Sequence, residues 1–240
     1  MSEKALPYSL KNQSSFSRQE FVKEMERTYR MTTSQIDYDL RKRIRKREIV
    51  RKGWGEYSVA SSKKEYIYQY SDLSKEIADQ LNNEYFDLNF RIFELVQLNA
   101  FLNHQMAHNT YFVYVENDFV DAVFDLLFRT YPGKVMLKPD ADHYFRYLLE
   151  NEIVVLRLPS ESPKGYDEPW HIKIEQILVE TMTSKLMSQI LPESEQRNLL
   201  GGAFSGYLVD EKTMIRYAKR KGTEKKVRAI LEKYEGLGTI

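Results

Sequence analysis

The segment "MTTSQIDYDLRKRIRKREIVRKGWGEYSV", residues 31–59, joins a helix-like pattern, a basic run and a Gly-Trp-Gly turn. Residues 41–52 contain eight Lys or Arg and one acid. Such a run at the end of a helix can be a solvated stretch that complements the helix dipole. The segments before and after the basic run therefore decide whether it is read as a solvated helix end or as a contact with nucleic acid.

The helical part of this segment begins at Thr32 or Thr33, either of which can cap the first turn. Ile36, Leu40 and Ile44 recur every four residues and share one face, which we expect to be buried. The same spacing places a polar and basic set on the opposite face: Ser34, Gln35, Tyr38, Arg41, Lys42 and Arg45.

A second helix is predicted before this one, over residues 17–29. Ser17 and Glu20 can form a capping box there. Its apolar stripe consists of Phe21, Val22, Met25 and Tyr29. The connection to the next helix, about residues 30–32, is short, and residues 1–15 read as a loose arm with at most one short turn. Residues 48–59 read as two β segments around a glycine-containing turn.

Two helices with a short connection, followed by a β-hairpin, are the order of a winged helix-turn-helix. In that motif the second helix enters the major groove of DNA, and the hairpin, or wing, contacts phosphates. Arg suits a bidentate contact with guanine and Gln one with adenine. At the hairpin tip, Trp54 either contacts DNA or folds back onto the domain. The predicted DNA-binding residues are Ser34, Gln35, Tyr38, Arg41, Lys42, Arg45, Arg51, Lys52 and Trp54.

Charge is distributed unevenly along the chain. Residues 1–64 contain 16 bases and 8 acids, a net charge of +8, whereas the remainder contains 20 bases and 27 acids, a net charge of −7. A basic segment on an acidic body is typical of a polyanion-binding module. We therefore expect a DNA-binding domain over 1–64 and a partner-binding or sensing body over 65–240.

The body alternates helical and extended patterns. Residues 72–84 read as a helix, and a strand-like stretch leads into helical residues 96–108. Residues 110–117, 134–139 and 152–159 read as strands, separated by helices over 118–131 and 140–150, and residues 171–191, 194–207 and 210–234 read as helical. We expect an α+β protein whose body has a small mixed or partly parallel sheet and a helical C-terminal part.

Carboxylates near the ends of the predicted strands raise the alternative of an enzyme. A metal-dependent nuclease or a nucleotidyltransferase would gather such groups. However, no strand carries Glu-x-Lys, no nucleotidyltransferase arrangement of Gly-Ser with Asp-x-Asp is present, and Asp118 and Asp140 stand where helix N-caps are expected. The carboxylates concerned are Glu116, Asp118, Asp140, Asp142 and Glu152.

Two further features favour structural interpretations, and a third is left open. His104 and His108 are four residues apart, but Gln105 stands where a zincin motif needs Glu. Gly201-Gly202 is not followed by Lys-Ser/Thr, so a flexible connection between two helices is expected instead of a phosphate loop. The basic stretch 212–228 either joins the DNA-binding surface, docks on an acidic partner or forms a solvated helix pair. We expect no catalytic residue, cofactor or metal.

The chain contains no Cys, no apolar leader at its start and no stretch of roughly 18 apolar residues that a membrane span needs. These features favour a protein of the cytoplasm that has no membrane partner.

Three short segments carry a family resemblance: "RKGWGEYSV" at 51–59, Leu178-Val179-Glu180 on a predicted helix, and "YAKRKG" at 217–222. With the order of its elements, the chain resembles the AbiEi-type antitoxins of bacterial abortive-infection systems. The aromatic-rich first helix and residues 89–105 depart from the family's form. The resemblance implies a transcriptional regulator that represses its own operon, made beside a nucleotidyltransferase-like toxin that it opposes in phage defence.

The leading hypothesis is thus a non-enzymatic regulator that binds double-stranded DNA. A homodimer is left open, because helix-turn-helix proteins often dimerise on palindromic sites. One alternative is a nuclease-like or nucleotidyltransferase-like enzyme of phage defence that is targeted to DNA. Another is an interaction module whose basic helix binds an acidic protein.

Overall fold

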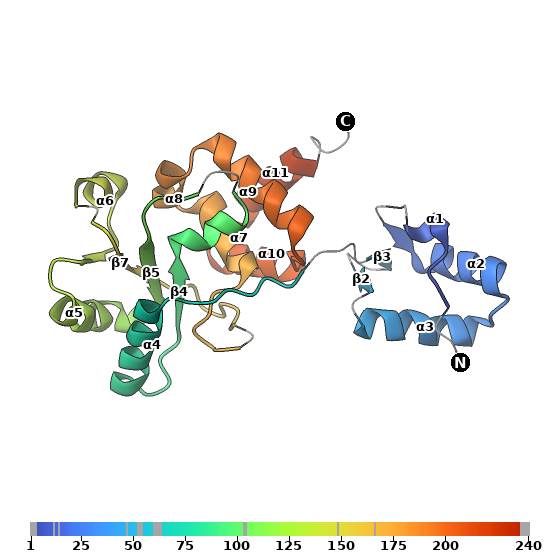
Figure 1. Cartoon of the computed structure of the whole chain (residues 1–240), viewed down its shortest axis with the longest axis horizontal. Coiled ribbons are helices and arrows are strands. Elements are labelled where there is room, and N and C mark those ends of the chain that lie inside the picture. Colours follow the sequence, from blue (N-terminus) through green and yellow to red (C-terminus); the bar gives the residue numbers. More distant parts are fainter. Residues whose placement is uncertain are drawn as a thin grey trace. The chain divides into compact units, whose positions relative to one another are not determined.

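The computed structural model describes residues 4–11, 13, 15–46, 48–51, 55–59, 64–102, 105–147, 149–165 and 167–235. The chain forms two compact units, Met1–Lys63 and Lys64–Ile240, each of which is described by itself below. The fold is mixed α+β with a helical C-terminal part, as expected (Figure 1). No helix of the described part has both the length and the apolar character needed to cross a membrane.

The described residues of the first unit form three helices and a three-stranded antiparallel sheet of order β1-β3-β2. Strand β1 lies before the second helix and was not expected; it pairs with β3 through Phe16 and Ser17. The elements are α1 (Tyr8–Lys11), β1 (Phe16–Ser17), α2 (Arg18–Tyr29), α3 (Thr33–Arg45), β2 (Ile49–Arg51) and β3 (Glu56–Val59).

Both long helices of this unit begin with a capping box. The Ser17 hydroxyl accepts from the Glu20 N–H at 3.2 Å while the Glu20 carboxylate accepts from the Ser17 N–H at 2.6 Å. Thr32 and Gln35 form the equivalent pair at the start of α3. The predicted apolar faces meet in a core of their own, which consists of Leu10, Phe16, Phe21, Met25, Ile36, Leu40, Ile49 and Tyr57.

The second unit contains a four-stranded sheet of order β4-β5-β7-β6. Strands β5, β7 and β6 are parallel, and β4 pairs antiparallel with β5. The expectation of a small, partly parallel sheet is therefore confirmed. The strands are β4 (Phe90–Glu94), β5 (Thr110–Val115), β6 (Val135–Leu137) and β7 (Glu152–Arg157).

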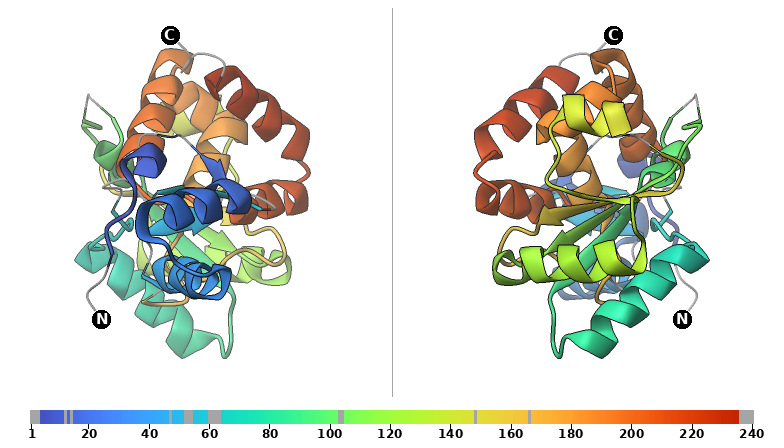
Figure 2. Two further views of the ribbon diagram at one scale, coloured as in Figure 1. Left: turned by 90° about the vertical axis from the view of Figure 1, so that its right-hand side faces the viewer. Right: turned by 90° about the vertical axis from the view of Figure 1, so that its left-hand side faces the viewer.

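Helices cover both faces of this sheet because its strands are apolar on both sides. One face packs against α4 (Asp72–Glu84) and α5 (Val120–Thr130). The other packs against α6 (Ala141–Tyr147) and the C-terminal helices (Figure 2). Residues Ile174 to Met182 of α7 are all buried, so α7 is the central helix of that layer. The C-terminal helices are α7 (Ile174–Thr183), α8 (Lys185–Ile190), α9 (Glu193–Gly206), α10 (Glu211–Arg220) and α11 (Glu224–Glu235).

The prediction of a helix over residues 96–108 is wrong. The chain forms a short 3-10 helix, η1 (Leu95–Ala100), and no regular helix over the rest of the described segment. The Asn109 side-chain oxygen accepts from the Val96 N–H at 3.3 Å, and that of Asn99 accepts from the Met106 N–H at 2.7 Å. The Asn99 side chain thus takes the place of the backbone acceptor that the Met106 N–H would have in a longer helix.

Two smaller expectations also need correction. Gly201-Gly202 does not connect two helices but lies inside α9, where a Cβ on Gly202 would stand 2.3 Å from the Phe101 carbonyl oxygen. Asp118 is not a cap: it lies within the short 3-10 helix η2 (Asn117–Phe119), and α5 is preceded by Phe119. Asp140 does cap α6, since its carboxylate accepts from the His143 N–H at 2.8 Å.

Candidate nucleic-acid interface

Helix α3 has two chemically distinct faces. Ile36 and Leu40 are fully or nearly fully buried in the core of the first unit, and Ile44 packs against that core. On the outer face Tyr38 is 63% exposed, which is unusual for a large aromatic side chain. Lys42 is half-buried there, and the exposed predicted residues are Ser34, Gln35, Tyr38, Arg41 and Arg45.

The remaining predicted residues belong to the hairpin. Arg51 ends β2 and is exposed, whereas Lys52 and Trp54 lie outside the described residues. Gly55 has a φ of 73°, a left-handed conformation that favours glycine, and its carbonyl accepts from the Arg18 N–H at 3.2 Å. Gly55, directly before β3, is thereby connected to the first residue of α2.

The two acids of α3 are both held in ion pairs. Arg18 donates from Nε and Nη2 to the two oxygens of Asp37, at 2.9 and 2.6 Å. This bidentate pair lowers the pKa of the Asp37 carboxyl, which is therefore ionised at neutral pH. Asp39 pairs with Arg43 at 2.6 Å. Because both carboxylates are partly compensated, the outer bases of the helix dominate its local potential.

Arg43, within the basic run 41–52, has a structural role. Arg43 is 3% exposed, and its guanidinium donates to Asp39 at 2.6 Å, to Glu48 at 2.8 Å and to the carbonyl of Lys4. It fastens α3 to the segments before α1 and before β2. Arg43 was not among the predicted DNA-binding residues, and the structure places it away from the outer face.

Two predicted residues are engaged within the helix. The Gln35 side-chain oxygen accepts from the Thr32 N–H at 3.0 Å, which closes the capping box. A bidentate contact with adenine would use that same oxygen, through its second lone pair or by opening the cap. Arg41 donates from Nε to the carbonyl of Asp37 at 3.1 Å, leaving the terminal nitrogens of its guanidinium for another partner.

The sequence did not predict the ion pair of Arg18 with Asp37. Arg18 is exposed at the start of α2, and its partner Asp37 lies 19 residues further along the chain. Local periodicity relates residues three or four apart, so it carries no signal for this pair. Only the packing of α2 against α3 brings the two together.

Two of the five carboxylates weighed for catalysis accept backbone hydrogen bonds within the fold. Glu116 accepts from the Asn89 N–H at 2.9 Å, and Asp140 caps α6. Glu152 is 1% exposed, and burial raises its pKa. Asp118 and Asp142 are exposed. Within the described part of the chain, no three Asp, Glu or His side chains are grouped closely enough to hold a metal ion; His104 lies outside that part.

Two of the segments that carried the family resemblance meet in the second unit. The Tyr217 hydroxyl donates to Glu180 Oε1 at 2.7 Å, and Lys221 Nζ donates to Glu180 Oε2 at 2.6 Å. Gln176 donates to the Tyr217 hydroxyl at 3.3 Å. Burial raises the pKa of Tyr217 well above its usual range, so the phenol stays protonated and donating. These contacts join α10 to α7.

Comparison with known proteins places the chain among related sequences. A search of curated proteins finds no significant match. One family model matches residues 35–236, from the first turn of α3 through the second unit to the end of α11. The chain therefore belongs to DUF6577, a family of unknown function.

Proposed function

We propose that the protein is a transcriptional regulator that binds double-stranded DNA, with α3 in the major groove. The observation that carries the proposal is the division of α3 into two faces. Its buried face fixes the helix on the unit's core, while Tyr38, Arg41 and Arg45 project from the other. Anchored on one side and basic on the other, the helix has what insertion into a groove requires.

The dimensions of α3 fit this role. Its 13 residues give a length of about 20 Å at about 1.5 Å per residue. Tyr38, Arg41 and Arg45 are spaced three and four residues apart and lie along one stripe. A stripe of this kind can follow a groove, with guanidinium groups directed at guanine edges or phosphates and the phenol at a phosphate or base.

The β2–β3 hairpin supports the same assignment. It follows α3 directly, pairs antiparallel from Ile49↔Val59 to Arg51↔Tyr57, and is extended by β1 into a three-stranded sheet. In a winged helix such a hairpin stands beside the recognition helix and neutralises phosphates. Arg51, the last residue of β2, would be its first phosphate contact.

The central test neutralises Arg41, Lys42 and Arg45 together by substitution with Gln. Duplex DNA from upstream of the protein's own coding region is titrated with the full chain in a fluorescence anisotropy or mobility-shift assay. We expect binding to be lost, and the dependence of any residual binding on salt to fall by about 0.9 in log–log slope for each lost phosphate contact.

A matched control replaces Lys75, Lys164 and Lys185, three exposed bases of the second unit, with Gln. It removes the same charge from the chain and should leave duplex binding intact. Unchanged binding by the α3 variant, with its circular dichroism preserved, would overturn the proposal. Equal affinity for duplex DNA and for poly-glutamate of matched charge would instead support an interaction module for acidic proteins.

We further propose that the regulator is the antitoxin of an abortive-infection pair and represses its own operon. This part rests on the resemblance to AbiEi-type antitoxins at residues 51–59, 178–180 and 217–222. The test is co-expression with the adjacent gene. Growth arrest by the neighbour alone, relieved by this chain, is expected; no arrest, or arrest without relief, would contradict the antitoxin role while leaving DNA binding untouched.

A further inference from the structure

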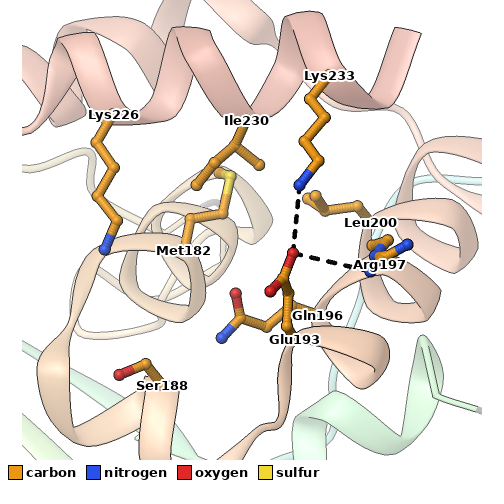
Figure 3. A pocket seen from close by; sticks show the side chains of 9 residues that line it. All are labelled: Met182, Ser188, Glu193, Gln196, Arg197, Leu200, Lys226, Ile230 and Lys233. Carbon is orange, nitrogen blue, oxygen red and sulfur yellow. Dashed lines mark hydrogen bonds and ion pairs between the residues drawn. The ribbon is translucent and has the colours of Figure 1, made fainter. Parts of the chain in front are cut away.

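A pocket of about 340 Å³ opens among helices α7, α8, α9 and α11 in the second unit (Figure 3). Small-molecule sites usually have volumes of about 300–1,000 Å³, and a cavity of about 150 Å³ already holds benzene. The pocket can therefore take a body of about two rings or a short acyl chain. It is lined by Met182, Ser188, Glu193, Gln196, Arg197, Leu200, Lys226, Ile230 and Lys233.

The floor of the pocket is apolar. Met182 at the end of α7 is 3% exposed and Leu200 in α9 is 2% exposed, and both belong to the large core of the second unit. Ile230 of α11 is half-buried and packs against the same core. Three helices thus present hydrocarbon surface to one hollow, which favours a ligand with an apolar body.

The wall formed by α11 alternates charge and hydrocarbon. Lys226, Ile230 and Lys233 are four and three residues apart, so they project from one face of the helix. Figure 3 shows the two lysine side chains on either side of Ile230, both directed toward the pocket. Any ligand that rests on Ile230 will therefore have an ammonium group close to one of its ends.

The two lysines differ in their partners. Glu193 pairs with Lys233 at 3.3 Å and with Arg197 at 3.8 Å, so one carboxylate is shared by two cations (Figure 3). Among the described residues, Lys226 has no ion-pair or hydrogen-bond partner. The lining contains three bases and one acid, a net charge of +2. Of this excess, one positive charge remains where Lys233 and Arg197 share Glu193, and the other is Lys226, which has no acidic partner there.

We propose that this pocket binds a small amphipathic anion. Its apolar body would lie against Met182, Leu200 and Ile230, and its acidic group, a carboxylate, sulfonate or phosphate, would pair with Lys226. A neutral ligand would leave Lys226 uncompensated beside the buried body, and a cationic one would be repelled by the three bases. The inference concerns the second unit and does not depend on the proposed binding of DNA.

The test uses the full chain and three probes of one shape: 2-naphthoate, 2-naphthamide and 2-naphthylmethylammonium. Binding is measured by isothermal titration calorimetry or by ligand-detected NMR. We expect 2-naphthoate to bind about tenfold more tightly than the amide, and the ammonium compound not to bind. Added salt should weaken the binding of the naphthoate more than that of the amide.

Two variants locate the contact. Lys226→Gln should reduce the affinity for 2-naphthoate to about that of 2-naphthamide, because the ammonium charge is replaced by a neutral amide. Lys225→Gln changes the adjacent exposed lysine, which does not line the pocket, and should leave the affinity unchanged. Equal affinity for naphthoate and amide, equal effects of the two variants, or no binding at millimolar concentrations would each overturn the proposal.

Discussion

The buried carboxylate of Glu180 depends on two side chains from a later part of the chain. Its side chain is 4% exposed, and its two oxygens accept separately from Tyr217 and Lys221. A buried charge that loses such a partner keeps its full desolvation penalty. Tyr217 and Lys221 therefore contribute to stability, because they hold α10 on the central helix α7.

This arrangement makes Tyr217→Phe a sensitive test. The substitution keeps the ring but removes the hydroxyl, so Glu180 Oε1 and Gln176 both lose a partner. We expect the free energy of unfolding to fall by about 1–3 kcal/mol, measured by urea denaturation followed by circular dichroism. Tyr147→Phe, at a residue 54% exposed, is the control and should have no measurable effect. Equal stabilities of the two variants would contradict this role of Tyr217.

Among the secondary-structure elements, α9 shows how packing overrides local preference. Glycine inside a helix is unfavourable by up to about 1 kcal/mol relative to alanine, yet α9 contains Gly201, Gly202 and Gly206. Gly202 is needed because the helix crosses the backbone of Phe101 so closely that no Cβ fits. The middle of α9 therefore packs directly against the backbone of the segment that follows η1.

Gly202→Ala should accordingly destabilise the protein by about 1–3 kcal/mol, because backbone atoms must move apart to admit the methyl group. Gly206→Ala in the same helix is the matched control, since nothing lies within 4 Å of its added Cβ. That variant should be neutral or slightly more stable. The thermal midpoint of each variant is measured under one set of conditions. The same shift for both variants would contradict a specific role for the contact between Gly202 and Phe101.

For the molecule as a whole, the distribution of apolar residues matches the two compact units. Among the described residues, the core of the first unit extends from Leu6 to Val59, and the two clusters of the second begin at Tyr66 and Tyr68. The excess of positive charge likewise belongs to the first unit, since residues 1–63 contain 15 bases and 8 acids. Each unit thus has its own core, and they carry opposite net charge.

We therefore expect residues 64–240 to fold without the first unit. This fragment should keep a cooperative thermal transition and the affinity of the full chain for 2-naphthoate, because every residue lining the pocket lies within it. It should lose most of the affinity for duplex DNA together with the basic segment. A fragment without cooperative unfolding would show that the second unit needs the first; retained duplex affinity would shift the DNA contact to the basic stretch 212–228.

Much of the fold follows from short-range pattern. Several elements agree with the expectations because each depends on residues a few positions apart: the capping box of α2, the Thr32 cap and apolar face of α3, helix α4, and strands β5 and β7. The hairpin β2–β3 could be predicted for the same reason. The outer face of α3 was identified as the face opposite the apolar repeat.

Other features depend on partners far apart in the sequence. Four such features join residues between 19 and 101 positions apart: the pairing of β1, the close approach of Gly202 to Phe101, the ion pair of Arg18 with Asp37, and the contacts of Glu180. The pocket likewise needs four helices packed together. No periodicity relates such residues, because their proximity is created by burial of apolar surface over the whole unit and not by the local geometry of the backbone.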